Sequence, residues 1–134
     1  MKKNILIIED EDTNYIASIN LLKEKYNVRI ARSLEAADNF FKLGHDVDLI
    51  ILDVMMSYHG YSAEETNYGM KTGLAYYNRK LREKTDVKVL VWTNNKDAIE
   101  KKEEWGENVV GLQLKMSEVE HLVNLVDKVF NEKK

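Results

Sequence analysis

Four separate segments of the sequence end in residues whose side chains can together carry out phosphoryl chemistry. Carboxylates that lie close together repel and raise one another's pKa unless a cation joins them, and Mg²⁺ is the hard cation that commonly pairs carboxylates with phosphate. A lysine and a hydroxyl nearby supply donors for phosphate oxygens, and an aspartate can act as a nucleophile. The residues that provide these groups are Glu9, Asp10, Asp53, Thr93 and Lys115.

Each of these residues stands at or just after the end of a short apolar segment that predicts a buried strand. Five such segments, each followed by a helical pattern, predict one α/β domain with a doubly wound parallel sheet and helices on both faces. The expected strand order is 2-1-3-4-5, the flavodoxin-like arrangement. The expected strands are Asn4–Ile8, Asn27–Ala31, Leu49–Asp53, Val87–Trp92 and Val109–Leu114.

This sheet brings the candidate residues together, because sites in open parallel sheets form beyond the carboxyl ends of the strands. Taken alone, the acidic run 9–12 has the composition of a solvated turn or helix cap, and one threonine or lysine indicates nothing. Four different strand ends that each carry a suitable residue are a more specific signal. We therefore expect all five side chains to converge on one rim of the sheet.

The helical segments have recognisable ends and apolar faces. The expected helices cover 12–26, 33–44, 73–83, 96–106 and 117–130. The residues expected at helix ends are Asp12 or Thr13, Ser33, Gly44, and the capping-box pair Ser117 and Glu120. The apolar face of the first helix is expected to consist of Ile16, Ile19, Leu22 and Tyr26.

Composition narrows the possible functions. At 134 residues the chain is long enough for one domain. Its net charge of −3 does not indicate the basic surface that a nucleic-acid-binding protein usually has. No apolar run approaches the length of about 18 residues that a membrane helix needs. The absence of cysteine excludes disulfides and thiolate metal sites, and it fits a reducing compartment, so we expect a cytoplasmic protein.

The motifs "ILIIEDE", "DLIILDVMM", "VLVWTN" and "LQLKM" resemble those of bacterial response-regulator receiver domains, the CheY-like superfamily of two-component signalling. The resemblance covers essentially the whole chain, so it implies a single receiver domain over residues 1–134. It also implies that Asp53 accepts a phosphoryl group from a phosphohistidine on a sensor histidine kinase or histidine phosphotransfer protein. Whether the chain stands alone or is part of a longer protein is left open.

The resemblance implies a role for each candidate residue. Asp10 and Asp53 would bind Mg²⁺ or Mn²⁺ directly, with the Met55 backbone carbonyl as a third ligand, and Glu9 would act mainly through bound water. Thr93 and Lys115 would contact the phosphoryl oxygens. Catalysis would be limited to self-catalysed phosphotransfer and dephosphorylation. A monomer or weak dimer that switches binding to a downstream protein target is expected, without contact to nucleic acid or membrane.

Three positions depart from the family pattern. Ser57 and Met116 stand where the family usually has proline, and Leu112 stands where it usually has a switch aromatic residue. A cis bond before a residue other than proline costs about 2.5–4 kcal/mol. The Lys115–Met116 bond is therefore either cis and strained, or trans with Lys115 presented differently.

The segment 57–72 makes the loop before Gly73 longer than in the family by about a dozen residues, and such loops are usually functional or disordered. Its apolar residues Tyr58, Tyr61, Tyr68 and Met70 are more than a disordered loop normally keeps. We expect it to pack partly on the domain near the acidic site, where it shields Asp53 or forms a docking surface. A tolerated, mobile insertion is the alternative.

Two other function classes remain open. Leu112, Met116 and the 57–72 segment are compatible with a receiver-like protein-interaction module that signals without phosphorylation. A metal-dependent phosphatase or nuclease on a similar sheet is less favoured. A small phosphodonor distinguishes the three, because a phosphoacceptor gains one acid-labile phosphoryl group at Asp53, an interaction module gains none, and an enzyme turns over its substrate.

Overall fold

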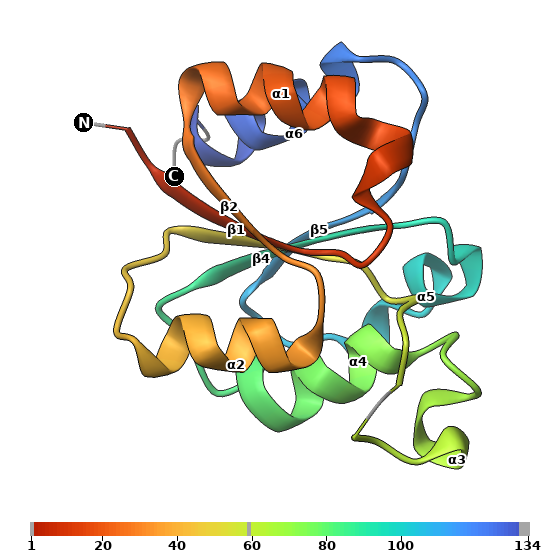
Figure 1. Ribbon diagram of the computed structural model, residues 1–134. Helices are drawn as coiled ribbons and strands as arrows, with labels where there is room; N and C mark the ends of the chain where they lie inside the picture. The colour runs from red at the N-terminus through yellow and green to blue at the C-terminus, as the bar shows by residue number, and fades with distance from the viewer. Residues whose placement is uncertain (1, 59, 132–134) are drawn as a thin grey trace.

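The computed structural model describes residues 2–58 and 60–131, which form one five-stranded parallel sheet with helices on both faces (Figure 1). The strand order is β2-β1-β3-β4-β5, as the sequence predicts, and every neighbouring pair is parallel. The strands are β1 (Asn4–Ile8), β2 (Asn27–Ala31), β3 (Leu49–Leu52), β4 (Lys88–Thr93) and β5 (Val109–Leu114).

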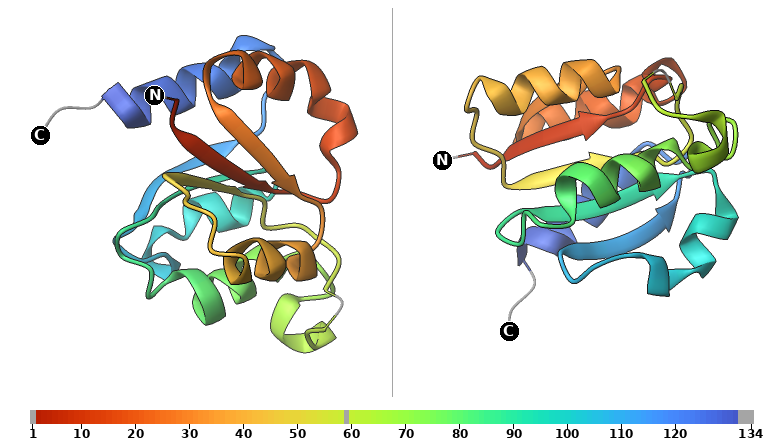
Figure 2. Two further views of the ribbon diagram at one scale, coloured as in Figure 1. Left: turned by 60° about the vertical axis from the view of Figure 1, so that its left-hand side comes forward. Right: turned by 90° about the horizontal axis from the view of Figure 1, so that it is seen from below.

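The helices form two layers, one on each face of the sheet (Figures 1 and 2). One layer consists of α1 (Ile16–Lys25) and α6 (Glu120–Asn131), and the other of α2 (Leu34–Lys42), α4 (Thr72–Tyr76) and α5 (Lys96–Glu100). Residues of β1 alternate between these layers: Ile5 and Ile7 pack toward α1 and α6, whereas Leu6 and Ile8 pack toward the other layer. All four residues of β3 are buried, which is why its segment reads as a continuous apolar run.

The first helix differs from the expected one. A 3₁₀ turn, η1 (Asp12–Tyr15), precedes α1, and neither element has a side-chain hydrogen bond at its N-terminus. The buried stripe contains Tyr15, Ile19 and Leu22, while Ile16 is 53% exposed. The expected place of Ile16 in this stripe is wrong, because Tyr15, one helical turn before Ile19, lies closer to the direction that Ile19 and Leu22 face.

Three later helices also depart from expectation, each because of a specific contact. The helix expected over 96–106 ends at Glu100, and a 3₁₀ turn, η3, covers Lys102–Glu104. There Trp105 Nε1 donates to the Ala98 carbonyl oxygen at 3.1 Å, the acceptor that a continuing α-helix would offer to the backbone of residue 102.

The helix after the 57–72 segment changes its winding at Tyr77. A π-helical turn, η2 (Tyr77–Leu81), follows α4, and the Arg82 backbone N–H donates to the Tyr77 carbonyl oxygen at 2.8 Å. The wider turn allows the adjacent Tyr76 and Tyr77 both to be fully buried. Their hydroxyl groups donate to Asp38 and Asn108 respectively.

The last helix begins at Glu120 rather than at the expected Ser117 cap, because the chain is still paired with the sheet at Lys115. The Lys115 backbone N–H donates to the Thr93 carbonyl oxygen at 3.0 Å, so the following residues must first cross from the sheet to the helical layer. In contrast, the expected ends of α2 are confirmed: Ser33 Oγ accepts a hydrogen bond from the Ala36 N–H at 3.0 Å, and Gly44 has φ +75°.

The 57–72 segment is held at both ends and contains a short helix, α3 (Ala63–Thr66). Ser62 and Glu65 form a capping box, and Arg79 of η2 donates to both carboxylate oxygens of Glu65 at 2.7 and 2.8 Å. The Thr72 hydroxyl donates to the Met56 carbonyl oxygen at 2.7 Å and closes the base of the segment. These contacts join the segment to the helix that follows it. His59, which belongs to the segment, lies outside the described residues.

We predict that Gly73→Ala lowers the free energy of unfolding by about 1–3 kcal/mol or more, because overpacking usually costs about this much. Gly73 lies against the chain that follows β3, and an added Cβ would overlap the Asp53 carbonyl oxygen and lie 2.7 Å from Val54 Cα. Both are backbone atoms and cannot rotate away. Chemical denaturation measures the loss.

Gly111→Ala is the matched control. Its added Cβ would meet only the end of a flexible side chain, Leu90 Cδ1, at 2.9 Å. We expect the free energy of unfolding of this variant to stay within about 1 kcal/mol of the wild-type value. The leucine can shift, and alanine lowers the conformational entropy of the unfolded chain, which favours the folded state. Equal losses in the two variants would contradict the close approach of α4 to Asp53.

Candidate functional site

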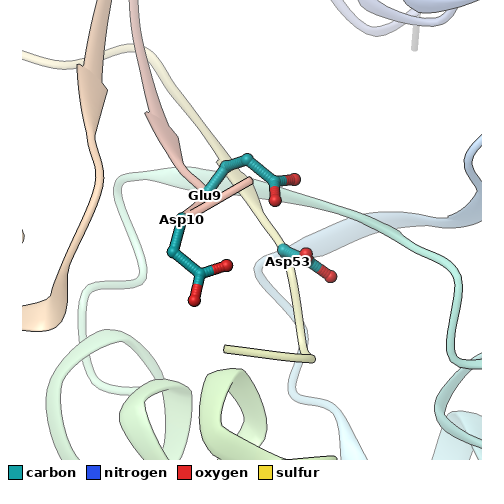
Figure 3. Close-up of side chains that lie close together, drawn as sticks. All are labelled: Glu9, Asp10 and Asp53. Carbon is teal, nitrogen blue, oxygen red and sulfur yellow. The ribbon is translucent and has the colours of Figure 1, made fainter. Parts of the chain in front are cut away.

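Three carboxylates meet beyond the ends of two neighbouring strands (Figure 3). Glu9 and Asp10 follow β1, Asp53 follows β3, and the last residues of these strands, Ile8 and Leu52, are paired in register. One carboxylate oxygen from each residue lies within 4.8 Å of the others. Glu9 is 1% exposed and Asp53 is 5% exposed, so two of the three carboxyl groups have little contact with water.

Lys115 supplies the cation that these buried carboxylates need. Its Nζ atom donates to Glu9 Oε1 and, at 3.1 Å, to Asp53 Oδ2, and its side chain is 4% exposed. Among residues 2–58 and 60–131 no peptide bond is cis, so the Lys115–Met116 bond is trans. The trans bond therefore still presents Lys115 to both carboxylates.

The pKa values in this cluster are shifted by burial and by the neighbouring charges. Burial, followed by repulsion from Asp53, raises the pKa of Glu9 to about 8, although the contact with Lys115 opposes the shift. Burial lowers the pKa of Lys115, but the attraction of Asp53 and the hydrogen bond to Glu9 outweigh it, so the net shift is upward. The structure therefore favours a charged lysine beside a glutamate that holds a proton up to unusually high pH.

Backbone donors orient the two aspartates. Asp53 Oδ1 accepts from the Met55 N–H at 3.2 Å, and Asp10 Oδ2 accepts from the Ser57 N–H at 3.0 Å. The second bond ties the start of the 57–72 segment to the acidic cluster. Met55 itself lines the cleft around the carboxylates, which is the place that a carbonyl ligand to a metal would require.

Thr93 lies at the end of β4 as expected, but its side chain is committed elsewhere. It is fully buried, and its hydroxyl accepts a hydrogen bond from the Asn95 N–H at 3.2 Å. Thr93 is not among the described residues that line the cleft around the carboxylates. The structure thus brings together Glu9, Asp10, Asp53, Met55 and Lys115, whereas Thr93 would have to turn to reach a ligand there.

Two aromatic residues that the sequence pattern did not predict lie beside Lys115. Its Nζ lies over the ring of Tyr15 at 5.0 Å from the centroid and over the ring of Trp92 at 5.2 Å. One signal was available: Trp92 directly precedes Thr93 and therefore faces the opposite side of the sheet, toward α1. The position of Tyr15 in η1 has no comparable signature.

The cluster opens into a cleft of about 220 Å³ that also includes Glu11, Asn14, Tyr15 and Asn94. No lining residue comes from the described part of the 57–72 segment, so that segment borders the site through Ser57 without covering Asp53. Closely spaced carboxylate oxygens are the donor set that Mg²⁺ and Mn²⁺ prefer. The residues present therefore fit a divalent cation together with an anionic group that Lys115 can contact.

Across the described residues, no helix is long and apolar enough to cross a membrane. No protein-family model and no curated protein matches the chain. Solved structures do match it. A response regulator from Thermotoga maritima has 24% sequence identity over 98% of this chain and 100% of its own, with a TM-score of 0.70.

The response regulator TrrA of Thermotoga maritima, in complex with Mg²⁺ and BeF, has 24% identity over 95% of this chain and 98% of its own, with a TM-score of 0.64. A structure of histidine kinase ThkA in complex with TrrA matches at 24% identity over 96% of this chain and 99% of the other, with a TM-score of 0.68. These likenesses agree with the observed strand order and with the arrangement of the helices. The chain therefore has the CheY-like fold of response-regulator receiver domains.

Proposed function

We propose that this chain is a single receiver domain that accepts a phosphoryl group on Asp53 and thereby switches its binding to a protein partner in the cytoplasm. The observation that carries the proposal is the contact of Lys115 with Asp53 beside Glu9 and Asp10. An unsupported carboxylate would be a poor acceptor for an anionic phosphoryl group, because the two negative charges repel. Here a buried ammonium group already lies where the incoming charge must be balanced.

In the proposed reaction, an Asp53 carboxylate oxygen attacks the phosphorus of a phosphohistidine. The new P–O bond forms as the P–N bond breaks, and the imidazole leaves with the electron pair of that bond and takes up a proton. Lys115 stabilises the phosphoryl oxygens during the transfer. Thr93 provides a further hydroxyl donor once it releases the Asn95 N–H, and this rearrangement is the proposed signal that the phosphoryl group is present.

Asp10, Asp53 and the Met55 carbonyl would hold Mg²⁺ or Mn²⁺, with Glu9 acting through bound water. The cation would neutralise charge on the phosphoryl oxygens and on the carboxylates. The TrrA complex with Mg²⁺ and BeF supports this assignment by its similar fold, and the acidic cluster supplies the oxygen donors. The complex of TrrA with a histidine kinase likewise supports a histidine kinase, or a related phosphotransfer protein, as the donor.

We predict that wild-type protein incubated with Mg²⁺ and acetyl phosphate gains the mass of one phosphoryl group, which is lost in acid. Asp53→Asn should gain none, because an amide cannot replace the attacking carboxylate. Intact-mass spectrometry measures both. Asp86→Asn is the matched control, since Asp86 is an exposed carboxylate in the turn before β4.

Each outcome of this experiment distinguishes a function class. A wild-type protein that gains no phosphoryl group would contradict the proposal and favour an interaction module that works without phosphorylation. Repeated release of phosphate that continues in Asp53→Asn would favour a phosphatase, because the self-catalysed cycle of a receiver passes through Asp53. Phosphorylation that persists in Asp53→Asn would place the acceptor at another residue.

A second prediction concerns pH. The pKa of Glu9 rises from 4.5 to about 8 on folding, so the unfolded chain releases this proton at lower pH than the folded chain does. Stability without metal should therefore fall as pH rises from about 4.5 to about 8. The loss should amount to a few kcal/mol, since one pKa unit corresponds to about 1.4 kcal/mol. The upward shift of Lys115 acts only at higher pH, because a lysine stays charged in both states throughout this window.

Urea denaturation of wild type and Glu9→Gln in chelator, at pH 5, 6.5 and 8, isolates this contribution. The glutamine variant keeps the size of the side chain but has no proton to release. Its free energy of unfolding, relative to that of wild type, should therefore increase as pH rises. Mg²⁺ at pH 8 should stabilise both proteins through Asp10 and Asp53, and it should stabilise wild type more, because only wild type can ionise residue 9. A constant difference across this range would show that Glu9 is ionised throughout.

A further inference from the structure

The Lys115 ammonium group is enclosed on four sides. Two of its neighbours are the carboxylates of Glu9 and Asp53, and the other two are the ring faces of Tyr15 and Trp92 at 5.0 and 5.2 Å. An aromatic face carries partial negative charge and attracts a cation, most strongly where water is excluded. The side chain is 4% exposed, so the two rings take the place of water around the ammonium group.

Different elements supply the two rings and pack them against each other. Tyr15 ends η1, five residues after Asp10, and Trp92 lies in β4 on the face toward α1. Their centroids are 5.0 Å apart and their planes meet at 68°, an edge-to-face pair. The Tyr15 hydroxyl also accepts a hydrogen bond from Asn94 Nδ2 at 3.4 Å, which links it to the loop after β4. The two rings thus form a rigid wall along one side of the lysine.

A lysine side chain has several rotatable bonds and keeps one position only where its surroundings restrict it. The backbone after Lys115 offers no such restriction here, because a trans bond to the flexible residue Met116 follows it and Met116 is 43% exposed. The two carboxylates attract the ammonium group, and the two ring faces beside its Nζ atom further restrict where it can lie.

We propose that Tyr15 and Trp92 form an aromatic clamp, in which the two ring faces position the Lys115 ammonium group on Asp53 and exclude water from it. Both are positioning residues that act through Lys115. For its role in phosphoryl transfer the clamp rests on the proposed function, whereas its effect on Lys115 exists in the resting protein. Tyr15 is the residue to test, because it is half-buried at the cleft, while Trp92 is 1% exposed and its removal would disturb the core.

The experiment measures how fast a lysine-acetylating reagent labels Lys115, without metal or phosphodonor, by peptide mass spectrometry. Lys96, whose side chain is 75% exposed, is the internal reference. Tyr15→Leu keeps apolar bulk but removes the ring, and it should raise Lys115 labelling relative to Lys96 by roughly tenfold, as expected for loss of a desolvated cation–π contact. Tyr15→Phe keeps the ring and should retain the wild-type protection.

Tyr26→Leu is the matched control. Tyr26 follows the other end of α1, where its ring packs on Phe130 and its hydroxyl donates to Asp127 at 2.5 Å, so its loss should loosen the α1 and α6 contact without changing Lys115 labelling. Unchanged labelling in Tyr15→Leu would overturn the clamp. Equal increases in Tyr15→Phe or Tyr26→Leu would also overturn it, because they would show a general loosening.

A second measurement separates the clamp from the proposed function. With Mg²⁺ and acetyl phosphate, the rate of phosphorylation of Tyr15→Leu should fall by a factor similar to the increase in labelling. If wild type accepts no phosphoryl group, the proposed function fails while the labelling result still decides whether the clamp exists. If labelling increases but the phosphorylation rate stays at the wild-type value, positioning of Lys115 by Tyr15 has no role in the transfer, and that part of the proposal is wrong.

Discussion

Two carboxylates buried at neighbouring strand ends are stable in this fold because one ammonium group lies between them. Glu9 and Asp53 are brought together by the pairing of β1 with β3, and Lys115 reaches both from β5. Without that contact the desolvation of two like charges would favour a protonated or unfolded state. Even with Lys115, burial and then repulsion from Asp53 raise the pKa of Glu9 to about 8, so Glu9 holds its proton more tightly than an exposed glutamate does. Three carboxyl groups meet one ammonium group here, and this surplus of oxygen donors makes the cleft suitable for a divalent cation.

Elements of both helical layers pack around this cluster and leave it open toward the cleft. On the face of α1, the rings of Tyr15 and Trp92 cover the lysine, and on the opposite face Gly73 allows α4 to approach the backbone of Asp53 closely. The Ser57 N–H supplies a hydrogen bond to Asp10. Residues of both helical layers therefore contact the cluster or the backbone beside it.

The 57–72 segment is connected to the site and to α4, but none of its described residues lines the cleft. The negative charge of Glu65, which could oppose an incoming phosphate, is paired with Arg79, whose guanidinium group also lies 4.0 Å from the centre of the Tyr61 ring. Tyr68 and Met70 of this segment remain 72% and 43% exposed, and Tyr68 has φ +56°, a conformation that few bulky residues adopt. The segment therefore adds surface beside the site, and one of its two acidic residues, Glu65, is paired with Arg79.

The sequence by itself determined the five strands, their order and the rim where Glu9, Asp10, Asp53 and Lys115 meet, because apolar runs and the handedness of crossovers are set by local pattern and chain connectivity. It did not determine where α5 ends, where α6 begins or that Thr93 turns to Asn95. Each of those features depends on a hydrogen bond between groups that only the folded backbone brings together. Examples are the bonds of Trp105 with Ala98 and of Lys115 with Thr93. The aromatic surroundings of Lys115 belong to the same class. Tyr15, Trp92 and Lys115 are far apart in the chain, and only the packing of η1 on β4 and β5 brings two rings to one ammonium group.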